Sequence, residues 1–60
     1  MNEKLKEVLK EKNVTQAELA ENVGVSQAFV SYMIKGYKQP SVILLKRMAE
    51  FLSVPMERLI

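Results

Sequence analysis

Apolar residues recur every three or four positions along most of the 60-residue chain, and no stretch alternates between apolar and polar long enough to predict a strand. This spacing predicts helices over residues 2–12, 16–23, 27–35 and 42–52. A fifth, short helix is expected at the end, with Pro55 in its first turn. The positions expected to face the core on the first four helices are Leu5, Val8, Leu9, Leu19, Ala20, Val23, Val30, Met33, Ile34, Val42, Leu45, Met48, Ala49 and Leu52.

Residues suited to beginning and ending helices stand between these segments. Thr15 and Glu18 form a capping-box pattern at the start of the second helix, and Ser26 and Ser41 are N-cap residues for the third and fourth. The residues suited to the left-handed conformation that ends a helix are Asn13, Gly24 and Gly36. Five helices with short connections predict one compact all-α domain over residues 1–60.

The composition is typical of a globular domain, with 48% hydrophobic and 27% charged residues, and it excludes several kinds of chemistry. The chain has no cysteine, histidine or aspartate, so we expect no disulfide, no metal site of the usual ligand types and no cofactor. Its glutamates are scattered over separate helix faces, so we expect no enzyme activity. No apolar run approaches 18 residues, so we expect neither a membrane span nor a signal peptide, and a cytoplasmic protein.

The charges are unevenly distributed, although the net charge is only +2. From Asn22 to Ala49 the chain carries four basic residues and no acidic one, whereas the remainder carries five basic and seven acidic residues. A local basic surface is expected where a protein meets phosphates. Lysines on a solvated face that contacts nothing are the alternative explanation.

The segment from Gln16 to Lys35 has the features of two short helices joined by a tight turn. Ala20 is small where the two helices must cross closely, Gly24 permits a positive φ, and Val30 locks the helices together. This arrangement is typical of a helix-turn-helix, whose second helix enters the major groove of DNA. We predict a helix-turn-helix over about residues 16–35, with a recognition helix over about 27–35.

Residues 5–60 resemble the lambda-repressor-like DNA-binding domains of the Cro and xenobiotic-response-element type. The segments that carry the resemblance are TQAELAENVGVS at 15–26, the predicted recognition helix ending at Gly36, KQPS at 38–41 and MAEFLSVP at 48–55. The resemblance implies a five-helix fold and a bacterial or phage transcriptional regulator. It also implies a homodimer that binds a double-stranded DNA operator of approximate two-fold symmetry.

The chain departs from this family's pattern at two positions. Many members carry an arginine where this chain has Leu9 and a glutamate where it has Ile34, and the two form a largely buried ion pair. Replacing both partners with aliphatic residues removes two desolvation penalties, and is often neutral or stabilising by about 1–4 kcal/mol. Because both positions have changed together, the departure is compatible with the resemblance.

The outward positions of the predicted recognition helix provide candidate DNA contacts. Gln27 is suited to a bidentate contact with adenine, a position where the resemblance also implies a base contact, and Ala28 offers a methyl group to thymine. The residues expected to read bases are Gln27, Ala28, Ser31 and Tyr32. Those expected to contact phosphate are Gln16, Ser26, Lys35, Tyr37 and Lys38. The alternatives are a capping role for Gln27, surface packing for Tyr32 and solvated lysines.

The predicted fourth and fifth helices carry more apolar residues than one small core easily encloses, among them Ile43 and Leu44. We expect a homodimer, and its candidate interface residues are Phe51, Met56, Leu59 and Ile60. The alternative is that these residues complete the core. A second functional hypothesis is a helix-turn-helix that binds protein, such as an antitoxin or a regulator held by a partner.

Overall fold

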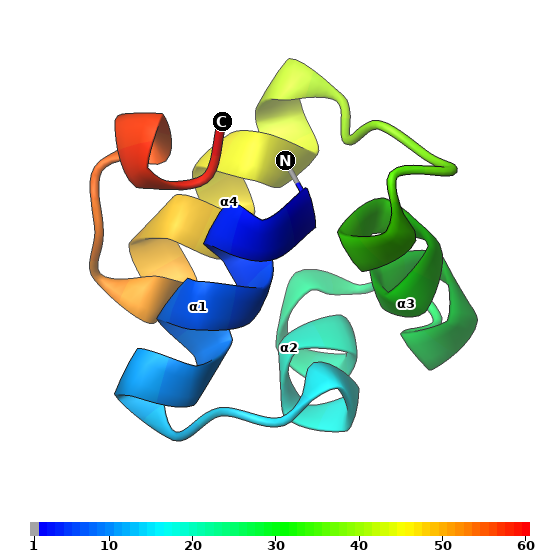
Figure 1. The fold of residues 1–60 in the computed structure, drawn as a ribbon, viewed down its shortest axis with the longest axis horizontal. Helices are drawn as coiled ribbons and strands as arrows, with labels where there is room; N and C mark the ends of the chain where they lie inside the picture. Colours follow the sequence, from blue (N-terminus) through cyan, green and yellow to red (C-terminus); the bar gives the residue numbers. More distant parts are fainter. Residues whose placement is uncertain (1) are drawn as a thin grey trace.

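Four α-helices and one 3₁₀ turn enclose a single core in the computed structural model, which describes residues 2–60 and measures 22 × 20 × 19 Å (Figure 1). The helices are α1 (Asn2–Lys12), α2 (Gln16–Val23), α3 (Gln27–Lys35) and α4 (Val42–Leu52). The turn η1 spans Met56–Arg58. All four predicted helices are confirmed with these bounds, and the part of the chain that the structure describes contains no strand.

The predicted short fifth helix is present only as a 3₁₀ turn. The N–H of Arg58 donates to the carbonyl of Pro55 at 3.0 Å, and the N–H of Leu59 donates to that of Met56 at 2.9 Å. Both bonds span three residues, which is the pattern of a 3₁₀ turn. The described residues therefore form four α-helices and one 3₁₀ turn.

The predicted helix ends are confirmed in detail. The hydroxyl of Thr15 accepts from the N–H of Glu18 and the Glu18 carboxylate accepts from the N–H of Thr15, each at 3.0 Å, so the capping box is complete. Ser26 and Ser41 cap α3 and α4 through their hydroxyls. The three predicted left-handed residues have positive φ, at Asn13, Gly24 and Gly36. Local sequence thus sets the starts of α2, α3 and α4 and the ends of α1, α2 and α3.

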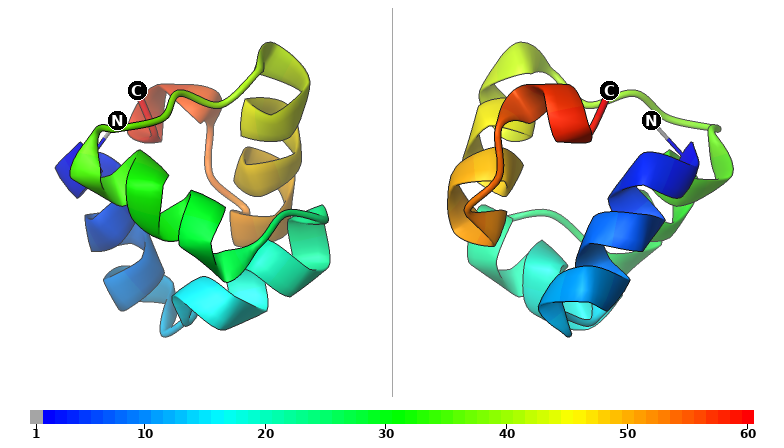
Figure 2. Two further views of the ribbon diagram at one scale, coloured as in Figure 1. Left: turned by 90° about the vertical axis from the view of Figure 1, so that its right-hand side faces the viewer. Right: turned by 60° about the vertical axis from the view of Figure 1, so that its left-hand side comes forward.

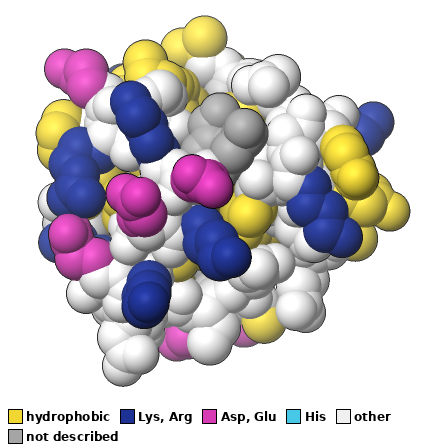
Figure 3. All heavy atoms as spheres, in the orientation of Figure 1, with side chains coloured by type: hydrophobic (Ala, Val, Ile, Leu, Met, Phe, Trp, Pro, Cys, Tyr) yellow, Lys and Arg dark blue, Asp and Glu magenta, His cyan; other side chains and the backbone are white. Residues whose placement is uncertain are grey.

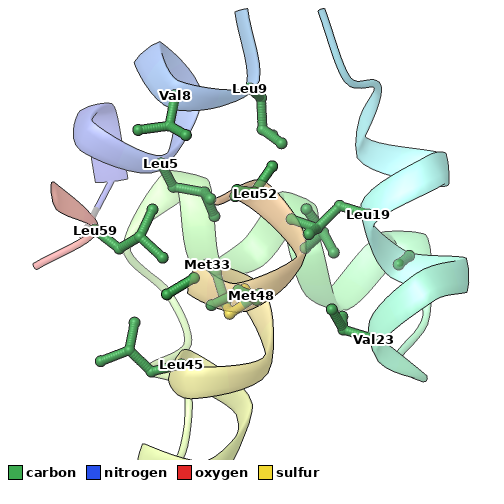
Figure 4. Close-up of a cluster of buried hydrophobic side chains, with 13 residues drawn as sticks. Leu5, Val8, Leu9, Leu19, Val23, Met33, Leu45, Met48, Leu52 and Leu59 are labelled. Carbon is green, nitrogen blue, oxygen red and sulfur yellow. The ribbon is translucent and has the colours of Figure 1, made fainter. Parts of the chain in front are cut away.

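The core consists of apolar side chains from all four helices and the residue after η1 (Figure 4). Among the described residues no polar or charged side chain is buried. The core residues are Leu5, Val8, Leu9, Leu19, Ala20, Val23, Val30, Met33, Leu45, Met48, Ala49, Leu52 and Leu59. Ile34 is half-buried against this core, so the apolar character predicted for the Leu9 and Ile34 positions is used in packing.

Val42 does not face inward as predicted, because its side chain is 74% exposed. It is the first residue of α4, directly after the cap Ser41, whereas burial on this helix begins at Leu44 and Leu45. A helical pattern gives the direction of a side chain but not the depth to which its helix end enters the core. The first turn of α4 therefore extends beyond the apolar cluster.

Leu59 is also not a surface residue, since its side chain is fully buried. Figure 4 shows it pointing into the same cluster as Leu5, and η1 packs against both α1 and α4. This corrects its prediction as a dimer-interface residue: the C-terminal segment folds back and completes the core.

Two polar contacts accompany this docking of the C-terminal segment on α1. Arg58 forms an exposed ion pair with Glu11 at 2.9 Å, and Lys4 donates to the carbonyl of Ile60. The hydrogen bond from Arg58, and then its positive charge, lower the pKa of Glu11 from its ordinary value. Both contacts are exposed, so the apolar burial of Leu59 dominates the docking. None of the described helices is long and apolar enough to span a bilayer.

Leu59→Ala tests whether the C-terminal segment belongs to the core. We expect a loss of about 2–5 kcal/mol in the free energy of unfolding, because a fully buried leucine is replaced by a cavity. Urea unfolding followed by circular dichroism measures the loss. Val42→Ala is the control: its side chain is 74% exposed and lies outside both the core and the candidate dimer interface, so the loss should stay within about 0.5 kcal/mol. Equal effects of the two substitutions would contradict the docking.

Candidate nucleic-acid interface

Three residues, Gly24, Val25 and Ser26, make the turn between α2 and α3. Gly24 has φ +80° and ψ +32°, and the N–H groups of Gly24 and Val25 both donate to the carbonyl of Ala20, at 2.9 and 3.0 Å. Apart from Gly24 and the two residues next to it in sequence, no atom lies within 4 Å of the position that a Cβ on Gly24 would occupy. Glycine is therefore favoured here by the backbone conformation rather than by space, and it turns the chain sharply out of α2.

The inner side of α3 is fixed by apolar packing. Val30 and Met33 are fully buried, and Ala20 on α2 is 4% exposed. α3 contacts both α2 and α1, and Val25 and Phe29 pack against the edge of the same core. The small side chain of Ala20 suits the close crossing of α2 and α3 that the sequence predicts. These contacts hold α3 in one orientation.

The opposite side of α3 is open. In the left view of Figure 2, α3 lies across the front of the molecule with no other helix before it. The exposed side chains on this helix are Gln27, Ala28, Tyr32 and Lys35. Because the helix advances 100° per residue, Ala28, Tyr32 and Lys35 share one face, and Gln27 lies beside it. The fourth base-reading candidate, Ser31, is half-buried at the edge of that face.

The N-terminus of α3 places Ser26 at the end of this face. Its hydroxyl oxygen accepts from the N–H of Phe29 at 3.0 Å, which leaves its own O–H hydrogen to donate outward. The first N–H groups of a helix have no partner within the helix, and together with the helix dipole they favour anions. Gln16, the other candidate at a helix start, is half-buried as the first residue of α2.

The C-terminal end of α3 gathers the remaining phosphate candidates. Gly36 adopts φ +84° and ends the helix, and Tyr37 and Lys38 are exposed in the loop that follows. Figure 3 shows hydrophobic side chains beside Lys or Arg side chains at this edge of the molecule, over α3 and the loop. The segment from Asn22 to Ala49 contains no acidic residue, so no carboxylate of this segment opposes a phosphate.

A family model described as helix-turn-helix matches residues 5–59, nearly the whole chain. The chain belongs to the helix-turn-helix family. The match confirms the lambda-repressor-like resemblance of the Cro type, and this family consists of DNA-binding regulator domains rather than enzymes. No curated protein matches the chain in sequence. The helix-turn-helix unit in the structure runs from Gln16 to Lys35, with α3 as its second helix.

Sequence reasoning missed one feature of this surface. Tyr32 and Tyr37, to which it assigns separate roles, pack together with ring centroids 6.2 Å apart. The signal was present: a glycine that ends a helix often brings the following residue back onto an apolar residue of the last turn. The pair therefore belongs to the way in which α3 ends.

Ser26→Ala tests how the start of α3 is fixed. Loss of the bond to the N–H of Phe29 should lower the free energy of unfolding by about 0.5–2 kcal/mol. Thermal or urea unfolding followed by circular dichroism gives the value. Ser31→Ala removes a serine hydroxyl from the same helix without touching the cap, and should change stability by no more than about 0.5 kcal/mol. If Ser26→Ala were as mild as Ser31→Ala, the cap would contribute nothing.

Proposed function

We propose that this helix-turn-helix domain is a sequence-specific transcriptional regulator of the repressor or Cro type, which inserts α3 into the major groove of an operator. The observation that carries the proposal is the asymmetry of α3. The side that carries Val30 and Met33 is buried in the core. The other side is open, free of carboxylates, and has Lys35 at its end and Lys38 in the loop that follows. A duplex with phosphates on both sides of a groove is complementary to such a surface.

The open face supplies chemically distinct groups for base recognition. Gln27, in the first turn of α3, offers a donor and an acceptor that match the N7 and N6 edge of adenine. The methyl group of Ala28 suits contact with the thymine methyl, and Ser31 offers a hydroxyl at the edge of the face. Tyr32 extends the surface toward the C-terminal end of the helix. We assign base contacts to these four residues.

The phosphate contacts are proposed at the two ends of α3 and at the start of α2. Ser26 and Gln16 offer polar side chains at helix N-termini, where the backbone N–H groups favour anions. Lys35, the last residue of α3, and Lys38, in the loop after it, offer exposed positive charges at the other end. Such contacts set the register of the protein on the duplex without reading its sequence.

We also propose that the domain binds its operator as a homodimer. α3 is only nine residues and about 13 Å long, so one copy reaches few base pairs. Two linked copies gain affinity by occupying two half-sites together. Candidate interface side chains remain after Leu59 is assigned to the core. Phe51 is 39% exposed and Ile60 is 58% exposed. Met56, which lies between them in sequence, is half-buried.

Selection from a random duplex library, followed by footprinting and titration at two salt concentrations, tests the DNA-binding proposal. We expect recovery of a two-fold sequence whose affinity falls steeply with salt, because bound phosphates release their counterions. Gln27→Ala should reduce discrimination at one base pair of each half-site by about 1–3 kcal/mol, whereas Lys38→Ala should weaken cognate and scrambled duplexes alike.

The same titrations separate this function from protein binding. An apolar contact with a protein partner would respond little to salt, and no sequence would be enriched from the library. Equal losses on cognate and scrambled DNA for Gln27→Ala would show that Gln27 does not read a base. If Lys38→Ala left the salt dependence of the DNA affinity unchanged, Lys38 would not contact a phosphate.

Phe51→Glu tests the dimer interface. A carboxylate in an apolar interface is strongly disfavoured, so we expect a monomer by analytical ultracentrifugation and at least about tenfold weaker operator binding. Ile43→Glu places the same charge on an even more exposed apolar residue near the opposite end of α4, and it should remain dimeric. If Ile43→Glu dissociated the dimer and Phe51→Glu did not, the interface would lie at the start of α4 instead.

A further inference from the structure

Two tyrosines from neighbouring segments meet at the C-terminal end of α3. Tyr32, on the open face of the helix, is 43% exposed, and Tyr37, in the loop, is 73% exposed. Their ring centroids are 6.2 Å apart and their planes are tilted by 44°. Aromatic rings at about 4.5–7 Å in offset or tilted arrangements attract each other beyond the area that they bury. Tyr37 therefore provides the Tyr32 ring with a neighbour that stabilises one position.

The backbone fixes this meeting. The N–H of Tyr37 donates to the carbonyl of Tyr32 at 2.8 Å, and the N–H of Gly36 donates to that of Met33 at 3.1 Å. With Gly36 left-handed at φ +84°, these are the two bonds of a Schellman motif. That motif returns the residue after the glycine to the helical residue five positions earlier. The contact between the rings is thus the apolar contact that accompanies this type of helix end.

Without such a neighbour, the Tyr32 ring would have freedom to move. A long side chain on a helix uses two of the three χ1 rotamers, and an exposed one exchanges between them rapidly. A group that must become ordered on binding loses entropy, and this loss weakens the complex unless the group is already held in place. An aromatic contact present in the free protein reduces that loss for a ring on the DNA-facing side.

We propose that Tyr37 is a positioning residue for base recognition, which holds the Tyr32 ring in its DNA-contacting orientation. This inference rests on the proposed DNA-binding function. The sequence predicts a phosphate contact for Tyr37 instead. The packing of its ring on Tyr32, with Lys35 and Lys38 available for the phosphates at this end of α3, favours the positioning role.

Three single variants and one double variant of the whole chain test the proposal. The variants are Tyr37→Ala, Tyr37→Phe, Tyr32→Ala and Tyr32→Ala/Tyr37→Ala. The probes are the duplex selected by the wild-type domain, a scrambled duplex, and each single base-pair variant of the selected site. Fluorescence anisotropy gives the affinity for each probe, and circular dichroism confirms folding. Tyr37→Phe keeps the ring and removes only the hydroxyl, so it is the matched control.

We expect Tyr37→Ala to reduce discrimination at the base pairs that depend on Tyr32 by about two- to tenfold, the range that corresponds to one aromatic pair. Binding to scrambled DNA should change little, and Tyr37→Phe should behave like the wild type. The double variant should discriminate no worse than Tyr32→Ala, because the two residues act as a unit. Losses from Tyr37→Ala and Tyr37→Phe that are equal on every duplex would overturn the proposal in favour of a phosphate contact.

A measurement without DNA separates this inference from the proposed function. In the free protein, the NMR signals of the Tyr32 ring should shift in Tyr37→Ala, and more than they do in Tyr37→Phe. Unmoved Tyr32 signals would overturn the positioning role even if the domain binds DNA. Failure of the wild type to enrich any duplex would instead reject the proposed function, and would do so whether or not the rings touch.

Discussion

The one-sided burial of α3 is the constraint on which the rest of the structure depends. Val30 and Met33 are fully buried, and both come from a helix of nine residues. A helix of that length is unstable alone in water, so its position comes from packing and from its ends. Val30 and Met33, with Phe29 and Ile34 packed at the edge of the core, fix the helix on one side and leave its other side free of core contacts. That freedom permits a recognition surface on so small a domain.

The caps at the helix ends add stabilisation that the core packing of so short a helix does not supply. Ser26 closes the start of α3 and the left-handed Gly36 closes its end, while Gly24 sets the angle at which the chain leaves α2. Each of these residues acts through its own backbone conformation or a local hydrogen bond, and none occupies space in the core. The C-terminal segment also helps to hold α3 in place, because Leu59 completes the core against which α3 packs.

What the sequence predicted well follows from local rules, and what it missed depends on tertiary contacts. The bounds of the four helices and the left-handed Asn13 follow from spacing and capping, which act within a few residues. The exposure of Val42 and the burial of Leu59 do not, because periodicity gives direction and not depth. The short fifth helix expected after Pro55 is a single 3₁₀ turn, because its closing hydrogen bonds span three residues. The open side of α3 was predictable because a helix with one apolar stripe has only one side to bury.

The distribution of charge has a consequence for how such a surface achieves selectivity. Non-specific affinity for DNA grows with each phosphate that is neutralised, whereas discrimination grows with contacts to base edges. Here the open face of α3 is uncharged from Gln27 to Tyr32, and the positive charges begin only at Lys35. With so few positive charges at the proposed interface, we expect one copy to bind arbitrary sequence weakly. In the proposed dimer, the pairing of two copies and the preorganisation of each side chain on the face would therefore supply most of the selective affinity.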